Sequence, residues 1–207
     1  MKGRQNPFVA REGLPFLLVT LIALGLTWQF AGSIAALPLA VLTAWLVLVF
    51  RDPHRSIPAS PLGVVSPVDG RVESTGVSDC GVVDGEVHTI RIRVDSFGTY
   101  TARAPVEGKI MDLQCDLDKD GPAPEQRGLW LRTDENSDVL LQFSGYRFGL
   151  SPRAFRGFGE RVGQGQRCAY LRLTRHAEIQ LPLASRIEVE VGQRVRAGET
   201  LLGQLPH

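Results

Sequence analysis

The segment Phe50–Gly76, with the sequence FRDPHRSIPASPLGVVSPVDGRVESTG, joins a long apolar run to a region of short alternating patterns. Charged side chains begin at Arg51, where the apolar run ends. Pro53, Pro58 and Pro61 then exclude a continuous helix, because proline lacks an amide hydrogen and restricts the residue before it. The segment therefore predicts a boundary between a membrane-embedded part and a separate domain, with a linker over residues 51–63.

The second half of this segment has the pattern of a turn between strands. Val64–Val65 and Arg71–Val72 are predicted to be short strands on either side of the Pro-x-Asp-Gly sequence at Pro67–Gly70. Gly70 is predicted to adopt a positive φ in this turn. We expect the domain over residues 64–207 to start here.

Upstream, residues 14–50 carry no charged side chain. Gly32-Ser33 divides them into Leu14–Phe30 and Ile34–Phe50, each near the lower limit of roughly 17–25 residues for a membrane span. The pattern favours a transmembrane helical hairpin over one tilted span. A cleavable signal peptide is disfavoured because the apolar stretch is too long. Cations flank both ends, so we expect residues 1–13 and the domain to lie on the cytoplasmic side of the membrane.

Downstream, the helical period gives way to apolar residues that alternate or cluster between glycines and prolines. Such patterns are typical of strands. They occur at Val87–Val94, Gly128–Thr133, Asp138–Gly145 and Ala177–Pro182. A mainly-β domain is therefore predicted.

The domain repeats its turn sequences. PVDGRV at residues 67–72 is echoed by PVEGKI at 105–110, and GERVGQG at 159–165 by GQRVRAG at 192–198. These echoes predict two related halves that close a small β-sandwich or barrel. The last one resembles the hairpin of biotinyl- and lipoyl-type domains, but the modified lysine of those domains is missing, so we expect no carrier function.

Composition narrows the function classes. A net charge of +1 indicates no bias toward nucleic acid. Three cysteines without C-x-x-C spacing, and four histidines without metal-ligand spacing, predict neither a disulfide framework nor a metal site.

Several motifs together resemble the phosphatidylserine decarboxylase family of the small bacterial and archaeal type. They are FRDPHR and SPVDGRV in the opening segment, FGTYTARAPVEG at residues 97–108, and GQRCAYLRLTRHAEIQLP at residues 165–182. The resemblance covers nearly the whole chain. It implies the bacterial inner membrane as the location, a membrane phospholipid such as phosphatidylserine as the ligand, and assembly as a homodimer or with a partner lipid enzyme.

The resemblance also implies a chemistry. Family members cut themselves at a Gly-Ser bond to make a pyruvoyl group, which forms a Schiff base with phosphatidylserine and releases phosphatidylethanolamine. An aspartate and a histidine assist the cut. Asp69 matches the aspartate, Tyr100 stands at the histidine position, and Thr174-Arg175 stand where the Gly-Ser pair belongs.

These substitutions predict a non-catalytic homologue without a pyruvoyl cofactor, because arginine has no hydroxyl or thiol. Two alternatives are a shifted nucleophile at Thr174, which would give 2-oxobutyryl instead, and Cys168, which is better explained as a buried side chain. An active decarboxylase with atypical processing is the competing function.

For the non-catalytic homologue, we predict that anionic phospholipid binds through its phosphate. The candidate ligands are Arg51, Arg55 and Arg103.

Overall fold

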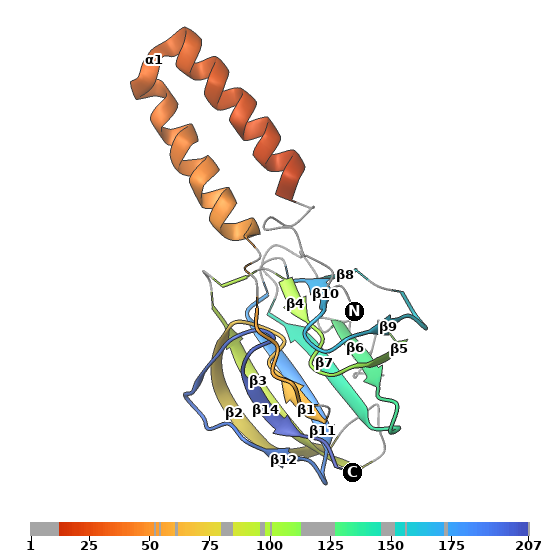
Figure 1. Ribbon diagram of the computed structural model, residues 1–207. Helices are drawn as coiled ribbons and strands as arrows, with labels where there is room; N and C mark the ends of the chain where they lie inside the picture. Colours follow the sequence, from red (N-terminus) through yellow and green to blue (C-terminus); the bar gives the residue numbers. More distant parts are fainter. Residues whose placement is uncertain are drawn as a thin grey trace, which may run out of the picture. The chain divides into compact units, whose positions relative to one another are not determined.

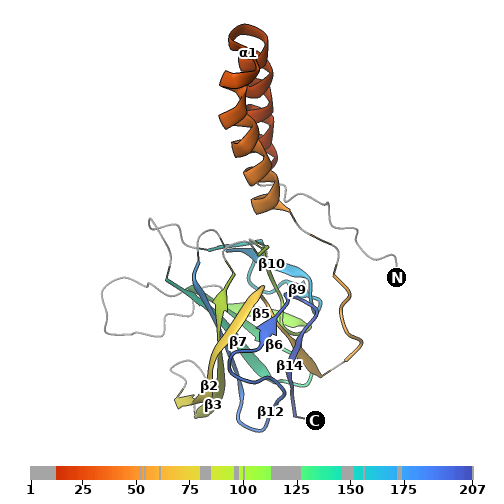
Figure 2. The ribbon, with the colours of Figure 1, turned by 90° about the vertical axis from the view of Figure 1, so that its left-hand side faces the viewer.

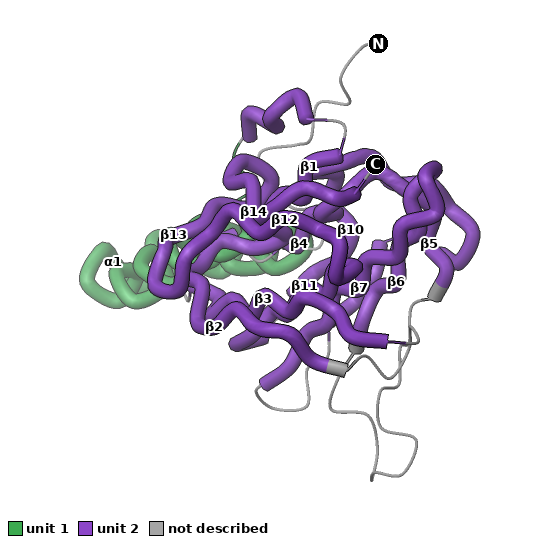
Figure 3. The backbone as a smooth tube through the Cα atoms, turned by 90° about the horizontal axis from the view of Figure 1, so that it is seen from below, with its two compact units in different colours: residues 1–54 green, residues 55–207 purple. Residues whose placement is uncertain are grey.

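The computed structural model describes residues 13–51, 53, 55–60, 62–79, 85–95, 98–99, 101–112, 127–145, 152–155, 157–171 and 174–206 (Figure 1). The chain forms two compact units, residues 1–54 and residues 55–207 (Figure 3). The first contains the helical segment and the second contains the strands.

Helix α1, Leu14–Phe50, folds back on itself as a hairpin (Figure 1). The break lies at Gly32, whose φ of 81° and ψ of 175° are accessible essentially to glycine alone. The rings of Phe16 and Phe50 stack with centroids 6.0 Å apart, so the two ends of α1 lie side by side. The predicted division at Gly32-Ser33 is therefore confirmed. By length and composition, α1 could cross a membrane.

The second unit is a mainly-β domain, as predicted. Its strands are β1 Gly63–Val65, β2 Gly70–Asp79, β3 Glu86–Val94, β4 Thr101–Arg103, β5 Gly108–Asp112, β6 Arg127–Arg132, β7 Asp138–Ser144, β8 Arg153–Ala154, β9 Arg161–Val162, β10 Arg167–Tyr170, β11 His176–Pro182, β12 Arg186–Ile187, β13 Arg194–Val195 and β14 Leu201–Gln204. Strand β2 is much longer than the two residues predicted.

Within the described residues these strands form three antiparallel sheets. The largest has the order β13-β2-β3-β11-β7-β6-β5-β9 (Figure 3), and the smaller ones are β1-β14-β12 and β4-β10-β8. The long strands β2 and β3 lie side by side in Figure 2. Alternation along β3 buries Ile90 and Ile92 while Arg91 and Arg93 point away from the core. Core residues of the smaller sheets, such as Leu202 of β14, belong to the same buried cluster.

The repeated turns correspond to repeated structure. Strand β13 pairs with the start of β2, as β9 pairs with the start of β5. The glycines that open the two later echoes, Gly159 and Gly192, have φ values of 81° and 90°. The glycines that close them, Gly165 and Gly198, have φ values of 68° and 74°. The domain therefore contains the two related halves that the sequence predicts.

Gly70 differs from its prediction. It is absent from the positive-φ glycines and is the first residue of β2. A Cβ atom at this position would lie 2.2 Å from the carbonyl oxygen of Arg93 on β3. Gly70 is therefore required by a close approach of two backbones, and the predicted positive φ is wrong.

Candidate functional site

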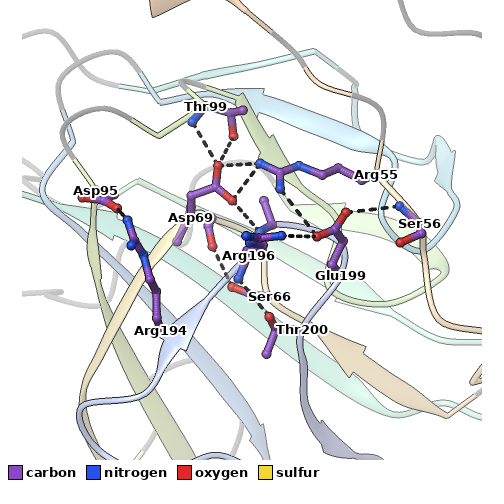
Figure 4. A network of polar contacts seen from close by, with 12 residues as sticks. Arg55, Ser56, Ser66, Asp69, Asp95, Thr99, Arg194, Arg196, Glu199 and Thr200 are labelled. Carbon is purple, nitrogen blue, oxygen red and sulfur yellow. Dashed lines mark hydrogen bonds and ion pairs between the residues drawn. The ribbon is translucent and has the colours of Figure 1, made fainter.

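Asp69 lies in the turn between β1 and β2, and its carboxylate is surrounded by donors (Figure 4). Arg55 Nη2 donates to both oxygens, at 3.0 Å to Oδ1 and 2.8 Å to Oδ2. The backbone amide of Ala197 donates to Oδ1 at 2.8 Å. Thr99 donates to Oδ2 from its amide at 3.1 Å and its hydroxyl at 3.0 Å. The charge of Asp69 is thus compensated within the domain.

Arg55 lies between two carboxylates. Besides Asp69, its Nη1 is 3.6 Å from Glu199 Oε2, and only 11% of its side chain is exposed. Glu199 also accepts a hydrogen bond of 3.4 Å from the amide of Ser56 and lies 3.7 Å from Arg196 Nη1. The guanidinium of Arg55 therefore holds the linker residues 55–56 against the turns at Asp69 and Glu199.

Thr174 and Arg175 precede β11. The Thr174 side chain is buried, and its hydroxyl donates to the carbonyl of Leu171. The Arg175 side chain is exposed, while its amide donates to Ser144 at 3.3 Å and its carbonyl accepts from Val94 at 2.8 Å. The backbone of Arg175 is therefore fixed between β7 and β3.

The structure brings the Asp69 turn and the Thr174-Arg175 segment to the same end of β3. The amide of Val94 donates to the backbone carbonyl of Arg175, and the amide of the next residue, Asp95, donates to the backbone carbonyl of Asp69 at 2.9 Å. Tyr100 lies outside the described residues, although the preceding Thr99 contacts Asp69. Two positions matched by the resemblance thus lie near the same end of β3, on its two sides.

Cys168 on β10 is completely buried. Burial raises the pKa of its thiol to about 12, so the thiolate that could act as a nucleophile is not formed near neutral pH. This agrees with its prediction as a buried side chain.

The arginines predicted to bind lipid lie in different environments. Arg103 is only 3% exposed and its Nη1 donates to the carbonyl of Gly165 at 3.0 Å. Arg55 is paired with Asp69, as described above. Arg51 is exposed at the end of α1. Lipid binding by these three residues stays a prediction, and two of them already have partners within the domain.

A pocket of about 390 Å³ lies next to the Asp69 turn and was not predicted from the sequence. It is lined by Gly70, Arg71, Arg93, Val94, Asp95 and Arg194. Alternation along β3 placed Arg93 outside the core, but nothing in the sequence indicated which residues of β2 and β13 lie beside it. No cluster of three or more His, Cys, Asp or Glu side chains suited to a metal ion occurs in the described part of the chain.

His176, the first residue of β11, provides a pH-dependent prediction. Its pKa is lowered from 6.5 chiefly by burial and then by the positive charge of Arg91, against the opposing effect of Glu73. Since the unfolded chain binds this proton more readily, stability should be fully present above about pH 6.5 and decrease as the pH falls toward the folded pKa. We expect His176→Gln to reduce the loss in free energy of unfolding between pH 7.5 and 5.0, measured by urea denaturation. An equal loss in both proteins would contradict this.

Comparisons with known proteins agree with the motifs, although no protein-family model matches the chain. The chain is 30% identical over 210 residues to the phosphatidylserine decarboxylase proenzyme of Nitrosomonas eutropha, and the alignment covers 96% of each chain. It is 31% identical over 212 residues to that of Burkholderia vietnamiensis, with 97% of each covered. A solved structure, glucose permease IIA from Mycoplasma capricolum, aligns with 69% of this chain and 94% of its own at 20% identity and a TM-score of 0.47, too low for any inference. The chain belongs to the phosphatidylserine decarboxylase family.

Proposed function

We propose that this chain is a membrane-anchored, non-catalytic member of the family that binds anionic phospholipid. The observation that carries the proposal is Arg175, which stands where the resemblance requires the serine of the Gly-Ser pair. A guanidinium cannot attack the preceding carbonyl or become a pyruvoyl group. The residues present therefore do not fit this prosthetic group.

Thr174 is a poor substitute for the missing serine. It is one residue too early, and its hydroxyl donates to the carbonyl of Leu171 from a buried position. To attack the carbonyl before it, the hydroxyl would have to give up that hydrogen bond and the β-branched side chain would have to rotate. This geometry supports an intact chain.

The surroundings of Asp69 support the same conclusion. A carboxylate that assists self-cleavage has to face the nucleophile or its base. Here both oxygens already accept hydrogen bonds from Arg55, Thr99 and Ala197. Asp69 is better explained as the structural partner of Arg55 than as a catalytic group.

Anchoring by α1 would keep the domain at a lipid surface. The two arms of α1 are each near the minimum length for a span, and the linker that follows leads directly to the β domain. We propose that the domain lies at the cytoplasmic face of the inner membrane, because cations flank both ends of the apolar run and anionic headgroups would be within reach there. A homodimer or a partner lipid enzyme stays a prediction, which crosslinking in membranes would test.

The test is the intact mass of the purified, denatured full-length protein. We expect one species at 22.7 kDa that gives no carbonyl adduct with hydroxylamine. A family member that carries the Gly-Ser pair, treated in parallel, should give two chains. Two fragments of this protein meeting near residues 173–175, the smaller blocked by a carbonyl, would instead support an active decarboxylase with atypical processing.

A further inference from the structure

Three arginines lie side by side across the exposed face of the large sheet. In the register of β13, β2 and β3, Arg194 is opposite Arg71, and Arg71 is opposite Arg93. Directly opposite residues point to the same face of a sheet, and all three side chains are exposed. Together with Asp95 they line the pocket of about 390 Å³.

This arrangement is unfavourable by itself, because like charges directly opposite each other on a sheet repel. Arg194 is compensated by Asp95, with Nη2 2.8 Å from Oδ2 (Figure 4). Within the described part of the chain, the side chains of Arg71 and Arg93 form no hydrogen bond or ion pair, although their backbones pair in the sheet. The pocket therefore has more positive charge than its own carboxylate can neutralise.

The related half of the domain provides an internal comparison. There Lys109 on β5 is opposite both Arg161 on β9 and Arg132 on β6, so the same row of three cations recurs. Arg161 is paired with Asp134, just as Arg194 is paired with Asp95. The two aspartates also occupy equivalent positions. Asp95 follows Arg93 of β3 by two residues, and Asp134 follows Arg132 of β6 by two residues.

The two halves differ in the partner of the arginine on the third strand of each row, which is Arg93 on β3 and Arg132 on β6. Arg132 forms two hydrogen bonds with Asp138, Nε to Oδ1 at 2.8 Å and Nη2 to Oδ2 at 3.1 Å. Its counterpart Arg93 has no such carboxylate among the described residues. The row of cations is thus a common feature of the repeat, and the half that contains the pocket has one carboxylate fewer to compensate it.

We propose that the pocket of Arg71, Arg93 and Arg194 binds a phosphate-bearing anion. Guanidinium groups donate to phosphate oxygens in a bidentate geometry, and a bound phosphate would relieve the repulsion in the row. The ligand is either the phosphodiester of a phospholipid headgroup or a soluble phosphate ester. The site would account for the phospholipid binding proposed above. It rests on that proposal only for the identification of a lipid as the source of the phosphate.

The experiment uses the full-length protein in phosphate-free detergent solution, with two probes. Inorganic phosphate is followed by titration calorimetry, and phosphatidylserine is compared with phosphatidylcholine in mixed micelles by native mass spectrometry. The test variant is Arg71→Gln/Arg93→Gln. The control, Lys109→Gln/Arg161→Gln, removes the same number of charges from the equivalent strands of the other half.

We expect the test variant to bind inorganic phosphate about 100-fold more weakly, since each charge-assisted hydrogen bond contributes about tenfold. The control should bind like the wild type. Loss of phosphatidylserine adducts in the test variant alone would identify a lipid headgroup. Loss of phosphate binding with unchanged lipid adducts would identify a soluble ester and remove the support for lipid binding at this site.

No phosphate or lipid binding by the wild type, or an equal effect of both double variants, would overturn the proposal. The melting temperature of the test variant is measured as well, and we expect it to be unchanged or higher because opposed like charges are removed; a loss of binding at that melting temperature is then not due to misfolding. The intact mass measures self-cleavage independently of phosphate binding. The phosphate site can therefore be disproved without disproving the proposal that the chain is not processed, and the reverse also holds.

Discussion

Replacing Asp69 with asparagine is expected to lower the free energy of unfolding by about 3 kcal/mol, because it leaves the mostly buried guanidinium of Arg55 with only the longer contact to Glu199. The side chains of Arg55 and Asp69 are only 11% and 14% exposed. Asparagine keeps the size of the side chain but loses the charge and one acceptor for the amides of Thr99 and Ala197. Urea denaturation of the full-length protein in detergent, followed by circular dichroism of the β domain, measures the change.

Asp95→Asn is the matched control. It removes a carboxylate from an arginine pair of the same 2.8 Å length, but Arg194 and Asp95 are 73% and 41% exposed. Exposed pairs contribute about 0–1 kcal/mol, so this variant should be nearly neutral. If Asp69→Asn is equally mild, Asp69 does not serve mainly as the partner of Arg55, and the argument against a catalytic role is lost.

Gly70→Ala is expected to lower the free energy of unfolding by about 2–3 kcal/mol. The new Cβ would lie 2.2 Å from the carbonyl oxygen of Arg93 and 3.0 Å from its carbonyl carbon. These are backbone atoms of β3, so relief requires moving one strand away from the other. Since Arg93 also lines the pocket, the variant should weaken phosphate binding as well as stability.

The control for this prediction is Gly76→Ala, on the same strand. A Cβ at Gly76 would meet nothing within 4 Å, and its φ is not among the positive values. Alanine should therefore be neutral or stabilise the protein by up to about 1 kcal/mol through the unfolded state. Equal effects at both glycines would contradict the close approach at Gly70.

The sequence predicted the elements of this fold because their signals are local. The uncharged run with Gly32 near its middle predicted the two arms of α1, and alternation predicted β3, β7 and β11. The repeated turns predicted the two halves. Gly70 was misjudged because a glycine required by a neighbouring strand has the same sequence signature as one required by its own dihedral angles.

The candidate site was only partly predictable because charge compensation depends on tertiary contacts. Arg55 was a candidate lipid ligand in the sequence, yet folding places it beside Asp69 and Glu199. Arg71 and Arg93 were not predicted as site residues. Their excess charge is apparent only from the strand register and from the comparison with Arg132 and Asp138 of the other half. A single sequence contains neither kind of information.

The central place of β11 determines what self-cleavage would mean for this domain. By the resemblance, the bond that the family cuts corresponds to the one between Thr174 and Arg175, shortly before β11, which is paired with β3 on one side and β7 on the other. A cut chain would therefore stay assembled as two polypeptides, and its unfolding would separate them, so that its melting temperature would rise with protein concentration. In the uncut chain proposed here, unfolding involves one molecule, and dilution should leave the melting temperature of the β domain unchanged.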